Sequence, residues 1–174
     1  MDKLKQLITE TNTEFKKADH LAYVTYPMVR ESKLLYAIAE VLYNSLHKGV
    51  EAVLEYERMY KRIPLVPGTF ETEIELFKDV SAKYGFNRNI VLLLLDLKRL
   101  IKAKKDSPVE FVRKDKFVIC DDDYTMSVLD INKIKAYVMD SREFMEKLNH
   151  VMRSVKPSEE NNRNSTHITE KRRF

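Results

Sequence analysis

The chain has 174 residues, of which 44% are hydrophobic and 33% are charged, and its formal net charge is +4. The length suits one domain with a sizeable core, and so small a net charge does not by itself require a polyanionic partner. The single cysteine, Cys120, excludes an internal disulfide, and three glycines are too few for a glycine-rich phosphate loop. We therefore expect a cytoplasmic protein that uses no cofactor. The longest apolar run, residues 90–95, is far shorter than the ~20 residues of a membrane span, so we expect no membrane association.

The first predicted helix covers residues 3–25, where apolar and small side chains recur at steps of three and four residues, as on one face of a helix. Pro27 predicts its end, because the residue before a proline is disfavoured in helical conformation. The second predicted helix covers residues 31–60, which contain no proline. Its apolar surface is broad enough to pack against two neighbours, as in a bundle.

The third predicted helix follows Thr69, which is expected to cap its N-terminus. The segment YGFN at residues 84–87 interrupts it with a glycine stop and an asparagine cap. A second piece follows at residues 88–104. Its run at residues 90–95 is apolar on every side, which predicts a position at the centre of the core.

Residues 108–129 change to short β-rich runs separated by charged turns, which predicts a hairpin of two or three strands. Asp130 is expected to cap the last helix, whose apolar residues alternate three and four apart as in a bundle seam. The sequence therefore predicts a mainly α protein, an antiparallel up-and-down helical bundle with a small β-hairpin before the last helix. Its domain spans residues 1–155, and residues 156–174 are predicted to be a disordered polar tail.

A polar stripe runs along the predicted helix at residues 31–60. His47, Glu51 and Glu55 are spaced four residues apart, so they project from nearly one face. A carboxylate-bridged metal site in a bundle needs glutamates and Glu-x-x-His pairs from facing helices. The residue three before His47 is Asn44, and no other predicted helix offers a Glu-x-x-His. We therefore expect no metal site here and interpret the stripe as scaffold or interface.

The segment ADHLAYVTYP at residues 18–27 is a second polar cluster, formed by Asp19, His20, Tyr23 and Tyr26. Tyrosines can stack on bases, and an Asp–His pair can poise an imidazole near neutrality. The packing of a helix end against the next helix explains the same residues and is the favoured alternative.

No nucleophilic or calcium motif is complete. Cys120 falls in a predicted strand, no serine lies in a glycine-flanked elbow, and DDDY at residues 121–124 lacks the glycine and closing glutamate of a calcium loop. We assign no catalytic residue from the sequence.

Basic residues gather between residues 98 and 116, where eight cations face three acids and give a local charge of +5. This pattern predicts a basic knob at the end of one helix and the base of the hairpin. Contacts to RNA phosphates are one interpretation, and a solvated turn is the other. The eight candidates for RNA binding are Lys98, Arg99, Lys102, Lys104, Lys105, Arg113, Lys114 and Lys116.

The stretch LLYAIAEVLYNSLHKGVEAVLEYE at residues 34–57 resembles the second helix of bundles in the HEPN superfamily, in particular of archaeal HEPN-like proteins. The resemblance covers residues 3–155. Members of this family are often dimers, so it implies a homodimer. We expect the dimer surface to include the tyrosines of this helix, which are Tyr36, Tyr43, Tyr56 and Tyr60.

Active HEPN proteins cleave RNA without a metal, by an arginine followed four to six residues later by a histidine. His150 lies eight residues after Arg142, outside this range, and His167 lies four residues after Arg163 but in the predicted disordered tail. The resemblance therefore implies a non-catalytic member, a binding or dimerisation module for RNA, a nucleotide or a partner protein. The alternatives are a ribonuclease-type HEPN protein, a toxin–antitoxin partner of a nucleotidyltransferase, and a structural adaptor.

Overall fold

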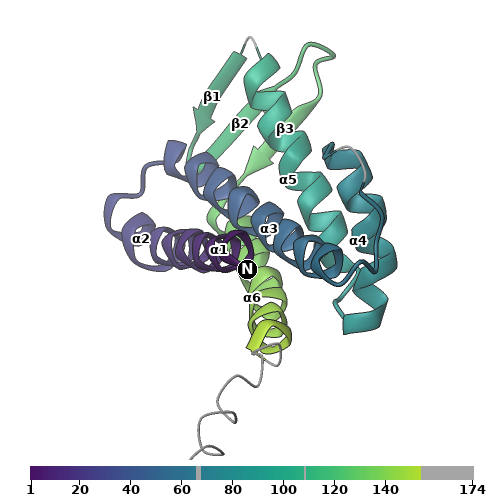
Figure 1. The fold of residues 1–174 in the computed structure, drawn as a ribbon. Helices are drawn as coiled ribbons and strands as arrows, with labels where there is room; N and C mark the ends of the chain where they lie inside the picture. Colours follow the sequence, from purple (N-terminus) through teal and green to yellow (C-terminus); the bar gives the residue numbers. More distant parts are fainter. Residues whose placement is uncertain (66–67, 108, 154–174) are drawn as a thin grey trace, which may run out of the picture.

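The computed structural model describes residues 1–65, 68–107 and 109–153, and the predicted tail lies outside the described residues. The chain is a mainly helical bundle with a small antiparallel sheet before the last helix, which confirms the predicted fold class (Figure 1). The elements in chain order are α1 (Asp2–His20), η1 (Leu21–Thr25), α2 (Tyr26–Val29), α3 (Lys33–Met59), α4 (Phe70–Tyr84), α5 (Asn89–Asp106), β1 (Val109–Arg113), β2 (Lys116–Cys120), β3 (Met126–Leu129) and α6 (Ile131–Arg153).

The first helical segment does not end before Pro27, so that prediction was wrong. It continues through the π-helical turn η1 and the short α2 to Arg30, whose left-handed φ of 49° ends it. In η1 the amide of Tyr26 donates to the carbonyl of Leu21, five residues earlier. This wider turn lies directly before a proline that has no amide hydrogen to donate, and the chain keeps its helical course for one more turn.

Helix α3 is the centre of the bundle and contacts α1, α4, α5 and α6, more neighbours than the two expected (Figure 1). Gly49 allows a close approach to one of these neighbours. A Cβ atom at this position would lie only 2.6 Å from Cε1 of Phe144 on α6. The largest fully buried side chains of α3 are Leu35, Ile38, Leu42, Leu46 and Leu54.

The predicted signals at both ends of α4 are confirmed, whereas Arg88 and not an asparagine stands at the N-cap of α5. The Thr69 hydroxyl accepts the amide of Thr72 at 3.3 Å, and Gly85 ends α4 with a φ of 64°. The run at residues 90–95 is only partly buried, however. Leu92 is 65% exposed and Leu95 is 43% exposed, because α5 packs on α3, α6 and β2 and leaves its remaining face to solvent.

The sheet has β2 in the middle, paired antiparallel with β1 on one side and β3 on the other. Phe117 and Ile119 of β2 are buried, and this strand contacts α3 and α5. Arg113 pairs with Lys116 across the β1–β2 turn. The chain then enters α6 through Asp130, whose carboxylate accepts the amide of Lys133 at 2.8 Å as predicted.

Candidate functional site

The eight basic residues do not form a single knob. Three of them already pair with acids. Lys98 lies 3.0 Å from Glu71, Arg99 lies 2.5 Å from Asp96, and Lys104 pairs with Glu110. Surface ion pairs of this kind contribute little to stability, but they reduce the net positive charge available to a ligand.

The other five basic residues form no ion pair within the described part of the chain, and they fall into two groups. Two lie near the C-terminal end of α5, and three lie around the β1–β2 turn, at the far end of β1 (Figure 1). A strand of this length separates the groups by roughly 10–15 Å at ~3.3 Å per residue. The α5 group is Lys102 and Lys105, and the turn group is Arg113, Lys114 and Lys116.

A groove of about 490 Å³ lies between α4 and α5, close to the α5 group. Its floor is apolar, and its rim carries four cations and two acids. The ammonium of Lys98 lies 3.5 Å from the centroid of the Phe70 ring in this groove. Three of the rim cations pair with acids, and Lys102 forms no ion pair within the described ranges. An apolar floor beside such a rim of net positive charge suits a nucleic-acid base together with its phosphate. The floor consists of Phe70, Ile74 and Leu95, and the rim cations are Lys78, Lys98, Arg99 and Lys102.

The polar cluster at residues 18–27 is divided by the fold. Asp19 accepts from Arg142 of α6 at 2.6 Å. The Tyr23 ring lies 5.9 Å from the guanidinium of that same arginine. Tyr26 is buried, its hydroxyl reaches the carbonyl of Asp115 at 3.5 Å, and burial raises its pKa. These contacts favour the helix-packing interpretation over an Asp–His pair.

His20 is exposed and lines a second groove, of about 540 Å³, between α1 and α6. This groove is crossed by two hydrogen bonds between the amides of Asn12 and Asn149, at 3.0 and 2.8 Å. Its rim carries both signs of charge, including Lys16 and Glu146. The α1–α6 groove therefore shows no preference for an anionic or a cationic ligand.

The polar stripe of α3 meets a carboxylate from a distant part of the sequence. Glu73, in the first turn of α4, lies 3.0 Å from Nε2 of His47, and Glu51 lies 4.0 Å from Nδ1 of the same ring. The Glu73 side chain is only 10% exposed, whereas those of His47 and Glu51 are 24% and 34% exposed. Glu55, one turn further along the stripe, pairs instead with Lys3.

Two aromatic rings surround His47. Tyr43 stacks on the imidazole with centroids 5.6 Å apart, and Phe70 lies 5.5 Å away at a tilt. Burial raises the pKa of Tyr43, and the charge of Glu73 adds to the effect. The two rings fix the plane of the imidazole, and Phe70 also belongs to the floor of the α4–α5 groove.

From the sequence we expected no metal site, because no facing helix offered a matching ligand motif. In the structure, Glu73 of the facing helix α4 lies beside His47. His47, Glu51 and Glu73 each offer a ligand atom within 4.8 Å of the others. In the sequence Glu73 already has a sufficient local explanation, because the helix dipole favours acids in a first turn. His47 and Glu73 are 26 positions apart in the sequence, and they come into contact only because α4 packs on α3.

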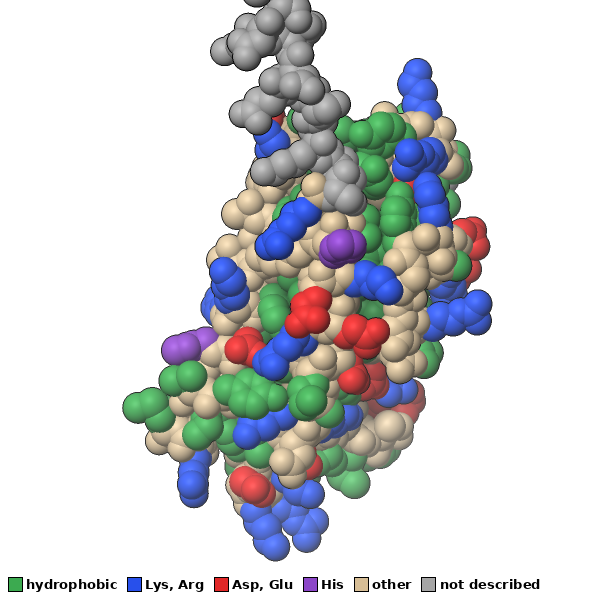
Figure 2. All heavy atoms as spheres, turned by 90° about the horizontal axis from the view of Figure 1, so that it is seen from below, with side chains coloured by type: hydrophobic (Ala, Val, Ile, Leu, Met, Phe, Trp, Pro, Cys, Tyr) green, Lys and Arg blue, Asp and Glu red, His purple; other side chains and the backbone are tan. Residues whose placement is uncertain are grey.

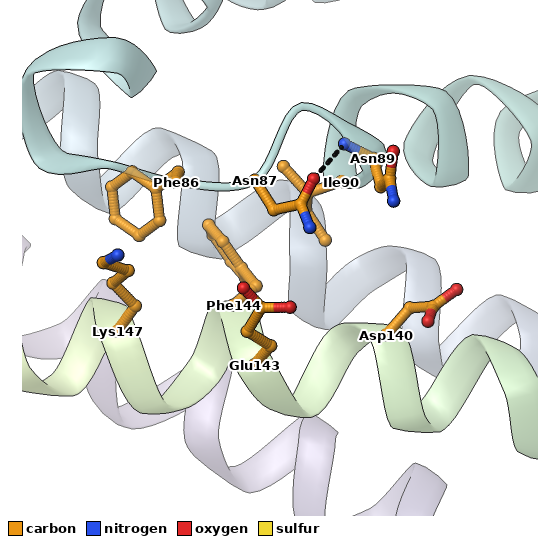
Figure 3. Close-up of a pocket in the computed structure, with 8 residues that line it drawn as sticks. All are labelled: Phe86, Asn87, Asn89, Ile90, Asp140, Glu143, Phe144 and Lys147. Atoms are coloured by element: carbon orange, nitrogen blue, oxygen red, sulfur yellow. Dashed lines mark hydrogen bonds between the residues drawn. The ribbon is translucent and has the colours of Figure 1, made fainter.

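A small cavity between the α4–α5 turn and α6 is too small for a ligand (Figure 3). Its volume is about 20 Å³, enough for about one water molecule. Asn87 lies at its edge and accepts the amide of Asn89 at 3.0 Å. Figure 3 places Glu143 and Lys147 of α6 opposite this turn.

None of the helices in the described ranges is long and apolar enough to cross a bilayer. Comparisons of the chain with protein-family models, curated proteins and solved structures found no match.

Proposed function

We propose that this chain is a HEPN-like, non-catalytic module of the cytoplasm that binds single-stranded RNA with little sequence preference. The observation that carries this proposal is the α4–α5 groove, whose apolar floor is bordered by cations and continues toward Lys102 and Lys105 at the end of α5. A base lies against the floor while the cations neutralise the adjoining phosphates. Affinity then comes mainly from the phosphates and depends strongly on salt.

The face of the molecule away from the sheet is a less suitable surface for RNA than the α4–α5 groove. Figure 2 shows that face with basic and acidic side chains interspersed rather than gathered by sign. A mixed face gives a polyanion no net attraction, because each phosphate meets an acid near every cation.

The absence of catalysis is supported by the position of the two residues that come nearest to the HEPN motif. Arg142 and His150 are eight residues apart on α6, which is about 12 Å along a helix axis at 1.5 Å per residue. Arg142 is also held by Asp19 at 2.6 Å. The ribonuclease alternative, including a toxin partnered by a nucleotidyltransferase, needs these two side chains to act together.

The proposal includes a homodimer, with a different surface from the one expected. Tyr56 is buried, and Tyr36 and Tyr43 pack against the core, so of the four tyrosines only Tyr60, the residue that follows α3, is exposed. Exposed apolar side chains lie instead around η1 and α2, where Met28 is 80% exposed. Light scattering at tens of micromolar checks this part, and a monomer mass contradicts it.

The test of RNA binding is fluorescence anisotropy of a labelled single-stranded RNA at several salt concentrations. The variant Lys102→Glu/Lys105→Glu/Arg113→Glu removes cations that form no ion pair within the described ranges. If all three contact phosphates, the slope of log affinity against log salt flattens by about two units, since each contact contributes ~0.7 on single strands. A control with the same change of charge is Lys5→Glu/Lys17→Glu/Arg153→Glu, on α1 and α6, and it is expected to keep most of the slope.

Three results contradict the proposal. The first is equal loss of binding in the two triple variants, which indicates a response to net charge alone. The second is cleavage of the RNA that is lost in Arg142→Ala or His150→Ala, which favours the ribonuclease alternative. The third is a wild-type chain that binds no RNA, which favours the structural adaptor.

A further inference from the structure

We propose that His47, Glu51 and Glu73 form a binding site for a divalent transition-metal ion of the zinc type. This site lies between α3 and α4 and adjoins the RNA groove at Phe70, but its three ligand residues do not line that groove. Charge, geometry and the chemistry of the ligand atoms each support it.

The two carboxylates lack a permanent counter-charge among the described residues. There, Glu51 and Glu73 form ion pairs with His47 and with no lysine or arginine. A carboxylate as buried as Glu73 is costly without a partner. A divalent cation compensates both carboxylates and binds the neutral form of the ring.

Glu73 is already placed to share a metal with His47, whereas Glu51 has to move. Glu73 faces Nε2 of the ring and Glu51 faces Nδ1, and a single ion binds only one of these nitrogens. Zinc lies about 2.0–2.2 Å from nitrogen and oxygen ligands, so tetrahedral ligand atoms are about 3.4 Å apart. Nε2 of His47 and Oε2 of Glu73 are already 3.0 Å apart, and all three side chains offer ligand atoms within 4.8 Å of one another. Glu51 is the most exposed of the three, so it has the freedom to turn inward.

The surroundings hold the site in shape. The rings of Tyr43 and Phe70 flank the imidazole and restrict its rotation, which reduces the ordering cost of metal binding. Imidazole with carboxylates suits zinc and similar transition metals, whereas magnesium and calcium prefer oxygen ligands throughout. Three protein ligands leave a fourth tetrahedral position for water.

The test is isothermal titration of the full chain with Zn²⁺, with Mg²⁺ as a second titrant. The expected result is one zinc per chain and no comparable binding of magnesium. His47→Asn, Glu51→Gln and Glu73→Gln should each weaken zinc binding by at least about tenfold, since loss of an outer-shell partner alone costs 10–100-fold. Matched controls are His20→Asn and Glu40→Gln, which make the same chemical changes at exposed positions of α1 and α3 and should leave binding unchanged.

Circular dichroism of each variant separates loss of a ligand from loss of the fold. Glu51→Gln is the decisive variant if the buried Glu73→Gln proves unstable, because Glu51 is partly exposed. The proposal is overturned if the wild type binds no zinc at millimolar concentration, or if zinc binding persists in all three site variants. It is also overturned if Cys120→Ser or His167→Asn abolishes binding while the site variants retain it.

Discussion

Two buried carboxylates lie on the facing helices α3 and α4, and they differ in how their charge is compensated. Glu57 of α3 is 2% exposed and contacts Lys83 at 3.0 Å, Arg62 at 3.1 Å and the hydroxyl of Tyr84. Glu73 of α4 is 7% exposed, and its one ion pair in the described chain is with His47. A lysine and an arginine pair with the first carboxylate, whereas a histidine ring pairs with the second.

Because their partners differ, we interpret Glu57 as part of a structural network and Glu73 as part of a candidate binding site. Burial acts to raise the pKa of Glu57, but hydrogen bonds from Tyr84, Lys83 and Arg62 outweigh it and hold the pKa below its usual value. Burial and the hydrogen bond to Glu57 in turn raise the pKa of Tyr84. Glu57 is thus permanently compensated and leaves no place for a further cation. Glu73 shares its imidazole with Glu51 and has no lysine or arginine partner among the described residues.

The largest expected effect is that of Glu57→Ala, which tests the structural half of this comparison. We expect a loss of about 2–4 kcal/mol in the free energy of unfolding, because charge-assisted hydrogen bonds are lost and a small cavity forms. Urea denaturation measures it. The control Glu75→Ala removes an exposed partner of Lys78 and should cost within about 0.5 kcal/mol. Equal costs for the two variants contradict the assignment of Glu57 as a structural group.

The pH dependence of stability gives an intermediate effect. A carboxyl whose pKa is lower in the folded state stabilises the fold above its unfolded pKa, about 4.3 for glutamate, and this contribution disappears as the pH falls through the folded value. Asp96 acts in the same direction, since Tyr137, Lys133 and Arg99 together outweigh its burial and lower its pKa. Urea denaturation between pH 6 and pH 2.5 should therefore show a smaller loss of stability for Glu57→Gln than for the wild type. Parallel curves for the two proteins contradict the lowered pKa.

Local signals in the sequence predicted three helix ends correctly, whereas Pro27 did not end the first helical segment. Thr69, Gly85 and Asp130 act within one turn of their own positions, so neighbouring residues suffice to identify them. Leu92 and Leu95 were predicted to be buried but are exposed. The sequence of a helix that is apolar on every side does not show which face lacks a packing neighbour.

The candidate sites depend on tertiary packing and were harder to predict. The basic residues looked like one cluster because they are close in sequence, and β1 places them in two groups. The opposite holds for Glu73 and His47, which are far apart in sequence and meet only where α4 packs on α3. Neither arrangement has a local signature.

The smallest expected effect, and the sharpest test of the comparison, is that of Glu73→Gln. Glutamine keeps the volume of the side chain and an oxygen that accepts from His47, and it removes the cost of a buried charge. Without metal we therefore expect a change of less than about 1 kcal/mol in the free energy of unfolding, well below that of Glu57→Ala. With zinc the two proteins should diverge, because a ligand at 100 times its dissociation constant stabilises the folded state by about 2.7 kcal/mol. Thermal melting with and without zinc measures both quantities, and the wild type alone should gain stability. A large loss in the metal-free variant would show that Glu73 is a structural anchor like Glu57.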